Sequence, residues 1–355
     1  MNSKNYNVIG VMSGTSLDGV DLAHLKFTLT NGKWQYSIKE SVTVSYPKEW
    51  VIKLKNAVNY SDTDLNTLNN EYTVLLAKII TDFITQHNIN NLDAVCSHGH
   101  TILHKPHEGI TLQIGNMQAI TATGYTTVCD FRVQDVELGG QGAPLVPIGD
   151  RLLFPNYTYC LNLGGFSNIS FEENGMRLAY DICPVNTVLN LFAEKLGYPY
   201  DDGGRIAKSG TVSESLLNEL NALEFYSLSH PKSLGIEYVN EVVLPVTEKH
   251  TISWQDKLCT FTEHIAYQIA KSVSDEAGNT ILVTGGGAYN SFLIARLQFY
   301  LNKTRVIIPD DKTIQYKEAL VFGLLGVLKL RDEVNVLASV TGAEHNHSSG
   351  RIYKV

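Results

Sequence analysis

Apolar and polar positions form a clear strand pattern near the start of the chain. Two apolar runs, Val8 to Met12 and Val20 to Phe27, are joined by Ser13 to Gly19, and an alternating stretch follows from Trp34 to Ser45. This pattern predicts three antiparallel strands. The first joint is short, glycine-bearing and rich in hydroxyls, so two interpretations are open. It is an ordinary hairpin turn, or a loop whose N–H groups, hydroxyls and carboxylate wrap a phosphate chain and hold its magnesium ion.

Helices and strands then alternate. One helix is expected after Pro47, and a longer one from about Asp64 to His87 has leucine, isoleucine and aromatic residues along one face. The apolar strand from Leu92 to Ile102 ends in polar residues, and short strands are expected at 111–114 and 126–129. Because ligands of α/β proteins bind near strand ends, we expect part of the site at the end of the 92–102 strand.

The opening pattern occurs a second time. Tyr157 to Glu173 has strand composition on both sides of Gly164 and Gly165. The chain therefore looks duplicated, with two halves that each begin with a hairpin and face each other across a cleft, where the two turns grip one phosphate chain. Chance similarity between two hairpins is the alternative.

Two further glycine clusters mark turns. The cluster from Gly139 to Gly142 predicts a tight loop leading to a helix N-terminus, which favours a polar or anionic ligand. The strand from Thr280 to Thr284 runs into Gly285, Gly286 and Gly287 and then a helix, an arrangement in which a base or phosphate can approach the backbone. A last helix is expected from about Ile314 to Leu330.

Composition narrows the class of protein. The chain has 355 residues, 44% hydrophobic and 18% charged, with a net charge of −8 and no basic block. We therefore expect a globular two-domain protein that binds neither nucleic acid nor membranes. The N-terminus lacks the apolar core of a signal peptide, and no apolar run approaches the roughly 20 residues of a membrane span. Five single cysteines without a C-x-x-C pair favour reduced thiols and a cytoplasmic location.

Seven motifs are spread between Val8 and Ala343: MSGTSLDGVD, SHGHT, DFR, GGQGAPLVP, NLGGFSNI, KSLG and SVTGA. Together they resemble those of the anhydro-N-acetylmuramic acid kinase family. More broadly, the paired hairpin loops and the VTGGGAYN turn resemble the actin, sugar-kinase and chaperone ATPase superfamily. The resemblance implies an α/β, two-domain actin-like (ribonuclease H-like) ATPase fold with duplicated mixed sheets flanking a nucleotide cleft. We expect domains at 1–130 and 131–339, with the tail from about 340 to 355 packing back on the first.

The implied activity is that of a phosphotransferase. ATP and water act on 1,6-anhydro-N-acetylmuramic acid to give N-acetylmuramic acid 6-phosphate, in peptidoglycan recycling and amino-sugar metabolism. Water attacks the anomeric carbon while the oxygen leaving it takes the γ-phosphoryl group, so one base is needed and no general acid. Asp181, at an expected strand end, is the predicted base; a helix N-cap is its alternative role. Another sugar kinase of this fold and a nucleotide-dependent binding protein without transfer activity remain alternatives, and a glycosidase is disfavoured because no acid pair is evident.

The resemblance also implies roles for other residues. Glu318 is expected to line the site as a second carboxylate, or to be a solvated helix residue, and Asp18 to hold Mg²⁺, or to be a plain turn residue. Arg132 is expected to pair with the lactyl carboxylate of the sugar, or with Asp135 or Glu137. A homodimer rests on the resemblance alone. The remaining expected contacts are, for ATP, Ser13, Gly14, Thr15, Ser16, Leu17, Asp18, Gly19, Val20, Gly164, Gly165, Gly285, Gly286 and Gly287, and for the sugar, His98, His100, Gly142 and Asn186.

The chain departs from the family at three positions. After the acid the family usually has Thr-Gly-Pro, where this chain has Ile182, Cys183 and Pro184, and His100 stands where glutamine is usual. The first departure puts the approach of the backbone to the substrate in doubt. His98, His100, His104 and His107 also raise a zinc hypothesis, which we disfavour because no cysteine or acid set completes the ligands. His345 and His347 are expected to be solvated tail residues.

Overall fold

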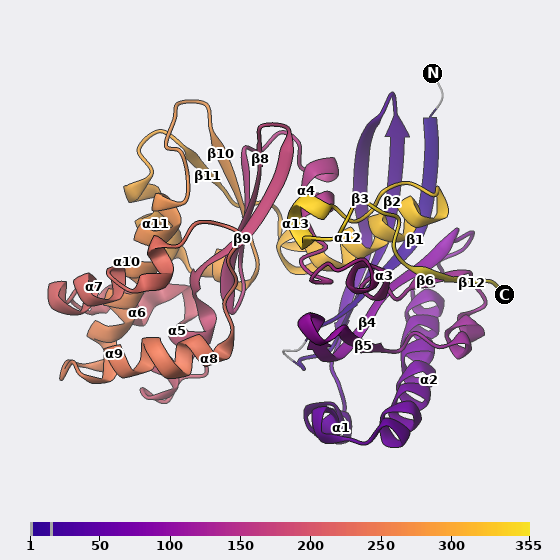
Figure 1. Cartoon of the computed structure of the whole chain (residues 1–355), viewed down its shortest axis with the longest axis horizontal. Helices are drawn as coiled ribbons and strands as arrows, with labels where there is room; N and C mark the ends of the chain where they lie inside the picture. The colour runs from indigo at the N-terminus through magenta and orange to yellow at the C-terminus, as the bar shows by residue number, and fades with distance from the viewer. Residues whose placement is uncertain (1–2, 15–16) are drawn as a thin grey trace. The chain divides into compact units, whose positions relative to one another are not determined.

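The computed structural model describes residues 3–14 and 17–355, and the chain forms two compact units (Figure 1). Unit 1 comprises Met1–Phe154 and Tyr316–Val355, and unit 2 comprises Pro155–Gln315. The expected boundaries were 130/131 and 339/340; in the structure, residues 131–154 and most of the last long helix, from Tyr316 onwards, group with the N-terminal sheet. A Cβ added to Gly10 would meet the carbonyl oxygen of Ala319 at 2.0 Å, so helix and strand are in direct backbone contact there.

The sheet of unit 1 contains the predicted N-terminal meander. β1 is antiparallel to β2 and β2 to β3, whereas β1, β4 and β6 are parallel. The order is β12-β6-β4-β1-β2-β3, with β5 also paired to β4. β12 therefore brings the C-terminal segment back to the sheet by pairing with β6. The bounds are β1 Ser3–Ser13, β2 Val20–Thr30, β3 Lys33–Val44, β4 Ala94–Lys105, β5 Ile110–Ile114, β6 Thr127–Cys129 and β12 Arg351–Tyr353.

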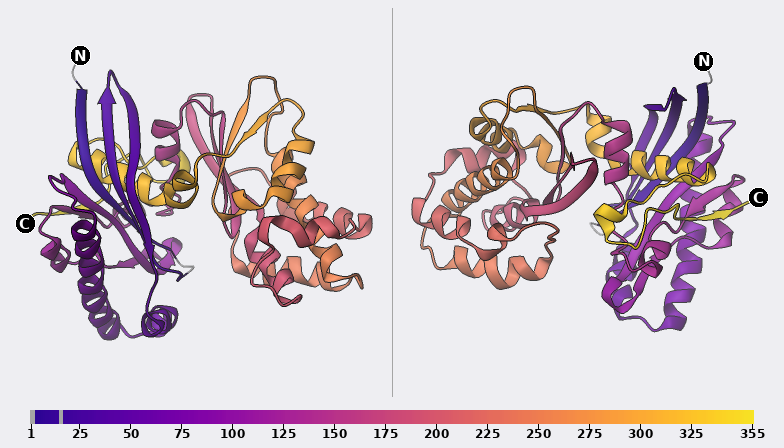
Figure 2. Two further views of the ribbon diagram at one scale, coloured as in Figure 1. Left: turned by 180° about the vertical axis from the view of Figure 1, so that it is seen from behind. Right: turned by 45° about the horizontal axis from the view of Figure 1, so that its top comes forward.

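Helices cover both faces of this sheet. The ribbon of α2 lies on one face and that of α12 on the other (Figure 2). Ile9 and Val11 pack in one core cluster with Leu76 and Ile80 of α2, while Gly10 contacts the backbone of α12. Burial on both faces explains why β1 is a continuous apolar run rather than an alternating one. The bounds are α1 Lys48–Asn56, η1 Ala57–Asn59, α2 Asp62–Gln86, η2 Pro106–Glu108, η3 Gln118–Thr123, α3 Val133–Glu137, α4 Pro147–Leu153, α12 Asp311–Leu330 and α13 Ala338–Thr341.

The sheet of unit 2 repeats that topology. Its order is β11-β10-β7-β8-β9, with β7/β8 and β8/β9 antiparallel and β10 parallel to both β7 and β11. The path β6-β4-β1-β2-β3 of unit 1 has the same sequence of directions. The predicted duplicated α/β fold is thus confirmed. The bounds are β7 Tyr159–Leu163, β8 Phe166–Glu173, β9 Met176–Pro184, β10 Thr280–Thr284 and β11 Arg305–Ile307.

Unit 2 has α10 at the centre of its helical layer. This helix is buried along most of its length and contacts α5, α6, α7 and α11 (Figure 1). Its apolar side chains join those of β7 and β10 in one core, which fixes the strand ends that carry the turns. The bounds are α5 Asn186–Glu194, η4 Asp202–Gly204, α6 Arg205–Ser209, α7 Glu214–Asn221, η5 Glu224–Ser227, α8 Ile236–Tyr238, η6 Val239–Val243, α9 Leu244–Glu248, α10 Trp254–Lys271, η7 Gly286–Tyr289 and α11 Ser291–Tyr300.

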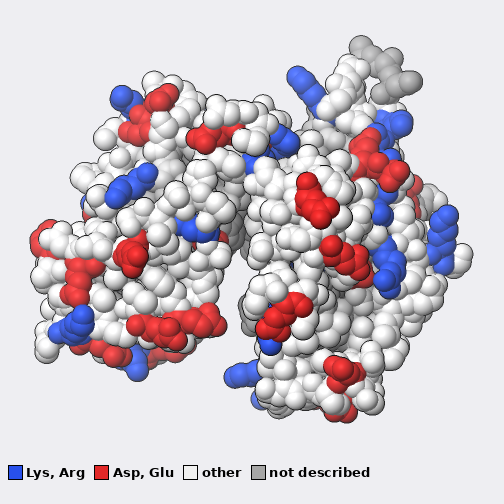
Figure 3. Space-filling model, in the orientation of Figure 1, with Lys and Arg blue, Asp and Glu red and all other residues white. Residues whose placement is uncertain are grey.

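Charged side chains of both signs are dispersed over the visible face of each unit (Figure 3). This fits the absence of a basic block in the sequence. Among residues 3–14 and 17–355, no helix combines the length and the apolar character that a membrane crossing requires.

Candidate active site

The first predicted phosphate loop lies between β1 and β2. Ser13 ends β1 with a side chain that is only 2% exposed, and Leu17 has a positive φ of 60°. Asp18 is exposed, whereas the side chain of Val20 is in the core, so only the backbone of Val20 is available to a ligand. Thr15 and Ser16 lie outside the described residues. At Gly19 a Cβ would meet the Val44 carbonyl oxygen at 2.5 Å, so the turn requires glycine at that position.

A chain of buried hydroxyls holds the start of this loop. The Ser13 hydroxyl shares hydrogen bonds with the Tyr46 hydroxyl at 2.6 Å and with Nδ1 of His100 at 2.8 Å. Tyr46 in turn bonds the fully buried hydroxyl of Tyr72. Burial lowers the pKa of His100 to about 4, so the ring is neutral at pH 7. The middle of β4 is therefore tied to the phosphate-loop candidate through the neutral imidazole of His100.

Three carboxylates are electrostatically coupled in unit 1. Burial raises the pKa of Asp21, a hydrogen bond from the Thr43 hydroxyl lowers it, and the charge of Asp18 raises it. Glu318, exposed on α12, interacts electrostatically with both Asp21 and Arg132. Glu318 makes no hydrogen bond or ion pair with the described residues. Its exposed side chain therefore agrees with a solvated helix residue as well as with a site residue. Its electrostatic interactions with Arg132 and Asp21 show that its carboxylate lies near these two candidate groups.

Arg132 links β4 to the glycine loop. Its Nε donates to Nε2 of His98 at 2.8 Å, and its Nη1 donates to the carbonyl oxygen of Gly142 at 2.6 Å. Since an arginine N–H can only donate, His98 carries its proton on Nδ1 and donates it to the Gly99 carbonyl at 2.9 Å. Both ring nitrogens of His98 thus have partners within the protein, and His98 holds Arg132. The expected contact of His98 with the sugar stays a prediction.

The predicted base lies in unit 2. Asp181 is inside β9, which continues to Pro184, rather than at the end of a strand, and the N-cap of α5 is Val185. The N-cap alternative for Asp181 is therefore excluded. The Leu234 N–H donates to Oδ2 of Asp181 at 2.9 Å, and the Asp181 N–H donates to the Lys232 carbonyl at 3.0 Å. Burial raises the pKa of Asp181 and the Leu234 hydrogen bond lowers it, with burial the larger effect.

Three backbone segments that carry predicted site residues converge in unit 2. The Gly164 and Gly165 carbonyls accept hydrogen bonds from the N–H groups of Asn186 and Val185 at 3.3 and 2.8 Å. A Cβ on Gly286 would lie 3.7 Å from Nδ2 of Asn186. The two glycine turns and the first residue of α5 therefore form one cluster, in which Gly165 and Gly286 are exposed and Gly287 is buried. Asn186, expected to bind sugar, lies with the predicted nucleotide turns.

The departure from the family pattern is buried. Ile182 and Cys183 are 2% and 0% exposed and belong to the core of unit 2. The Ser167 hydroxyl donates to the Cys183 carbonyl at 3.0 Å and accepts from the Cys183 N–H at 3.1 Å. Both side chains are therefore almost fully buried, and that of Ile182 also lines a pocket with Tyr180 and Lys232.

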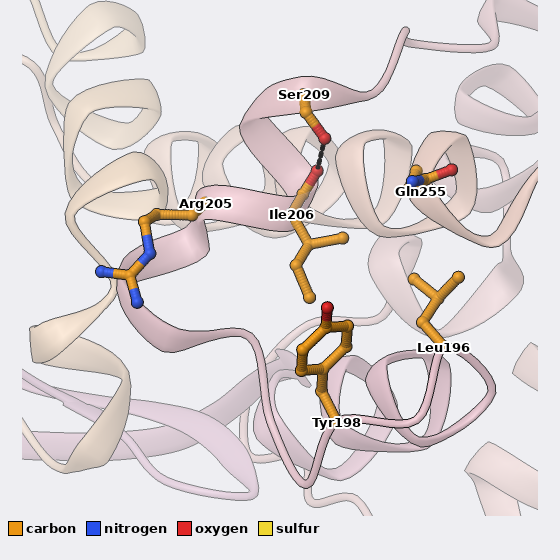
Figure 4. A pocket seen from close by; sticks show the side chains of 6 residues that line it. All are labelled: Leu196, Tyr198, Arg205, Ile206, Ser209 and Gln255. Carbon is orange, nitrogen blue, oxygen red and sulfur yellow. Dashed lines mark hydrogen bonds between the residues drawn. The ribbon is translucent and has the colours of Figure 1, made fainter.

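A cavity of about 380 Å³ in unit 2 contains none of the predicted site residues (Figure 4). Its lining comes from the segment that follows α5, from α6 and from α10, with Tyr198 directed towards Ile206. Arg205 at its edge is paired with Asp202. The cavity thus offers no reactive pair of groups. The lining residues are Leu196, Tyr198, Arg205, Ile206, Ser209 and Gln255.

Histidines outside the site have structural environments. His347 is only 5% exposed, and its Nε2 lies 3.5 Å from Oδ1 of Asp135, so the expectation of a solvated tail residue was wrong for it. The C-terminal segment packs on unit 1 instead of extending into solvent. Among the described residues no group of three or more histidine, cysteine or acidic side chains is arranged to hold a metal ion.

Several residues of these clusters escaped prediction. Asp21 lies two residues beyond the first turn, and the alternation of β2 was the available signal for its orientation. Tyr46 and Leu234 are distant in sequence from their partners Ser13 and Asp181, and no local pattern points to either contact.

Comparison with known proteins identifies the family. Residues 6–355 match the family described as anhydro-N-acetylmuramic acid kinase. The anhydro-N-acetylmuramic acid kinase of Pasteurella multocida is 38% identical, with 97% of this chain and 96% of the relative covered, and that of Haemophilus influenzae is 32% identical, with 99% of each covered. Among solved structures, the activator of the 2-hydroxyisocaproyl-CoA dehydratase from Clostridium difficile aligns with a TM-score of 0.40 and 14% identity, covering 92% of this chain and 96% of that one. The duplicated mixed sheets are those of a two-domain actin-like fold. From its full-length match and these relatives, the chain belongs to the anhydro-N-acetylmuramic acid kinase family.

Proposed function

We propose that this protein is an ATP-dependent kinase that opens 1,6-anhydro-N-acetylmuramic acid with water and phosphorylates O6, giving N-acetylmuramic acid 6-phosphate. The match to the kinase family over residues 6–355 supports the phosphotransferase activity and the sugar substrate. The observation that carries the mechanism is the environment of Asp181, a carboxylate with a raised pKa and one oxygen held by the Leu234 N–H.

Asp181 is proposed as the general base. Its Oδ2 accepts from Leu234, and Oδ1 makes no hydrogen bond to the described residues, so Oδ1 is available to a water molecule. In the reaction, Asp181 takes a proton from water, and the water oxygen bonds to C1 of the sugar. The C1–O6 bond breaks, O6 bonds to the γ-phosphorus, and ADP leaves. A raised pKa makes the carboxylate a stronger base.

For ATP, we propose the backbone of the Ser13–Val20 turn in unit 1, and the Gly164–Gly165 and Gly285–Gly287 turns in unit 2. Exposed glycine turns present N–H groups that suit phosphate oxygens. The oxygens of Asp18, exposed and coupled to Asp21, fit a hard cation such as Mg²⁺. Bound there, Mg²⁺ would neutralise phosphate charge.

For the sugar, we propose Arg132 as the partner of the lactyl carboxylate. Burial lowers its pKa to about 10, so the guanidinium remains charged at neutral pH. Two of its N–H groups are used by His98 and Gly142, and the others remain for a carboxylate. Nε2 of His100 makes no hydrogen bond to the described residues and suits a sugar hydroxyl. Glu318 is proposed to stabilise positive charge that develops at the anomeric carbon.

One assay tests this function. The protein is incubated with ATP, Mg²⁺ and 1,6-anhydro-N-acetylmuramic acid in ¹⁸O-water, and the product is weighed. We expect the gain of one phosphoryl group and one labelled water. Phosphoryl transfer without water would indicate a different sugar kinase, hydrolysis alone a glycosidase, and ATP binding without product a binding protein; each of these outcomes contradicts the proposal.

Cytoplasmic location and homodimerisation are proposed with it. The five cysteines are free thiols buried in the protein, which fits a reducing compartment, and ATP is abundant in the cytoplasm. The dimer rests on the family resemblance, and the mass of the protein measured in solution by light scattering tests it.

A further inference from the structure

One buried carboxylate organises the glycine loop of unit 1. Asp135 of α3 is 0% exposed, and its Oδ2 accepts from the Gly142 N–H at 2.6 Å. Its carbonyl oxygen accepts from the Gly140 N–H at 2.8 Å. A Cβ on Gly140 would meet Oδ2 of Asp135 at 2.3 Å, so the loop closes around this side chain. The loop conformation therefore depends on the Asp135 carboxylate.

The C-terminal segment supports the same carboxylate from the other side. The Thr341 hydroxyl donates to Oδ1 of Asp135 at 2.7 Å, and Nε2 of His347 lies 3.5 Å from that oxygen. The Gln141 N–H donates to the Thr341 carbonyl at 2.8 Å. Asp135 thus connects the loop to a segment some 200 residues away in the chain, and the known partners of its two oxygens are Gly142, Thr341 and His347.

The orientation of the Gly142 peptide matters for Arg132. The N–H of Gly142 points to Asp135, and its carbonyl accepts from Nη1 of Arg132 at 2.6 Å. The N–H and the carbonyl of Gly142 belong to two successive peptide planes joined at its Cα, so a hydrogen bond that holds the first plane restricts where the carbonyl of the second can lie. The same guanidinium is held on its Nε by His98. Two fixed acceptors leave the remaining N–H groups of Arg132 with a defined direction.

We propose that Asp135 is a positioning residue for recognition of the sugar's carboxylate. It aims the Gly142 carbonyl, which with His98 fixes the plane of the Arg132 guanidinium against the lactyl carboxylate. This inference rests on the proposed function and adds to it a residue that touches neither ligand. A bidentate arginine–carboxylate pair depends on the guanidinium plane, so its loss affects sugars that carry the carboxylate and spares those that lack it.

The test compares two sugars. The Asp135→Asn variant keeps the volume of the side chain but has one acceptor oxygen where Asp135 uses two, so it cannot accept from both the Gly142 N–H and the Thr341 hydroxyl. The remaining oxygen is also uncharged, so it holds the Gly142 N–H more weakly. Dissociation constants are measured by calorimetry for 1,6-anhydro-N-acetylmuramic acid and for 1,6-anhydro-N-acetylglucosamine, which lacks the lactyl group. We expect about tenfold weaker binding of the first sugar, the order of one charge-assisted hydrogen bond, and no more than about a twofold change for the second. The rate at saturating sugar should stay within about threefold.

Asp130→Asn is the matched control. Asp130 is also a buried carboxylate of unit 1, 8% exposed, but its partners are Asn116 and Arg351 and not the glycine loop. The control should bind both sugars as the wild type does. If Asp135→Asn weakens both sugars equally, or neither, the positioning role is refuted.

Thr341→Val provides a second variant, should Asp135→Asn fail to fold. It removes the hydroxyl donor to Oδ1 and leaves the Gly142 contact, so we expect the same selectivity change at about threefold. An equal effect on both sugars would overturn the inference here as well. Failure of the proposed function is recognised separately, because the wild-type protein would then not convert 1,6-anhydro-N-acetylmuramic acid at all.

Discussion

Replacement of Asp181 by asparagine removes the proposed base with little other change. The asparagine carbonyl oxygen can still accept from the Leu234 N–H, which bonds Oδ2 of Asp181 at 2.9 Å in the wild type. The Asp181 backbone N–H would keep its bond to the Lys232 carbonyl. The position of the segment from 232 to 234 is therefore preserved, and the change in rate reports on proton removal from water.

The magnitude follows from the role. A positioned general base contributes about 10²–10⁴ in rate, which corresponds to about 3 to 5.5 kcal/mol of activation free energy. We expect turnover of Asp181→Asn to fall by that factor and ATP affinity to stay within about twofold, because the glycine turns do not include Asp181. In the wild type, burial raises the pKa of Asp181, so activity should fall as the pH drops through a value above the ordinary 3.8. The residual activity of the variant should not show this fall at low pH, which is the acid limb of the pH–rate profile.

The measurement is ADP release with 1,6-anhydro-N-acetylmuramic acid across a pH series, together with ATP binding by calorimetry. Asp82→Asn is a suitable control, since Asp82 is a 62% exposed partner of Lys78 on the surface of α2. Its activity should equal that of the wild type. Retention of more than about a tenth of wild-type turnover by Asp181→Asn, with the acid limb intact, would refute the assignment of the base.

Three further changes test the rest of the site. Gly286→Ala should leave the midpoint of unfolding unchanged, because the added Cβ meets no protein atom closer than 3.7 Å, and it should raise the KM for ATP. Gly287→Ala should lower the midpoint of unfolding, because its Cβ would lie 2.7 Å from Cβ of Leu163. Unchanged ATP kinetics in Gly286→Ala would contradict an adenosine turn there. Cys183→Gly should lower the free energy of unfolding, measured in urea, by about 1–3 kcal/mol, because the side chain is fully buried, and should leave the affinity for the sugar unchanged. Weaker sugar binding would count against a purely structural role. The wild type should lose stability between pH 7 and 5, because the pKa of His100 is near 6.5 in the unfolded chain and about 4 in the folded one, so the unfolded chain takes up the proton first. His100→Gln should reduce this loss by about 2 kcal/mol. An identical loss in both proteins would refute this pKa.

Local patterns were sufficient for the elements but not for the unit boundaries. Strand composition and glycine turns predicted both hairpins, because these pairings join neighbouring segments. The pairing of β12 with β6 and the contact of Ala319 with Gly10 join residues more than 200 positions apart. Such contacts depend on the assembled sheet, so the expected division placed residues 316–339 with the C-terminal half, whereas they lie in the same compact unit as the N-terminal sheet.

The candidate site shows the same limit at the level of side chains. The motif predicted Asp181 and the glycine turns, which have a distinctive local sequence. It did not predict that Arg132 occupies Nε2 of His98, or that His347 lies beside Asp135. Both facts depend on which side chains a folded strand end brings together, and alternation alone leaves their partners undefined.

The buried departure at Ile182 and Cys183 bears on how the substrate is chosen. These two residues replace a hydroxyl and a glycine of the family pattern, yet they point into the core, where Ser167 bonds both the N–H and the carbonyl of Cys183. The strand therefore reaches Pro184 on a fixed path, and Asn186 still meets the Gly164 carbonyl. Since both side chains are packed in the core of unit 2, we expect the substitution to change the packing there and to leave the groups available to the sugar unchanged. Selection of the muramyl sugar is then expected from Arg132 and its supports in unit 1, where a charged partner for the lactyl carboxylate is present.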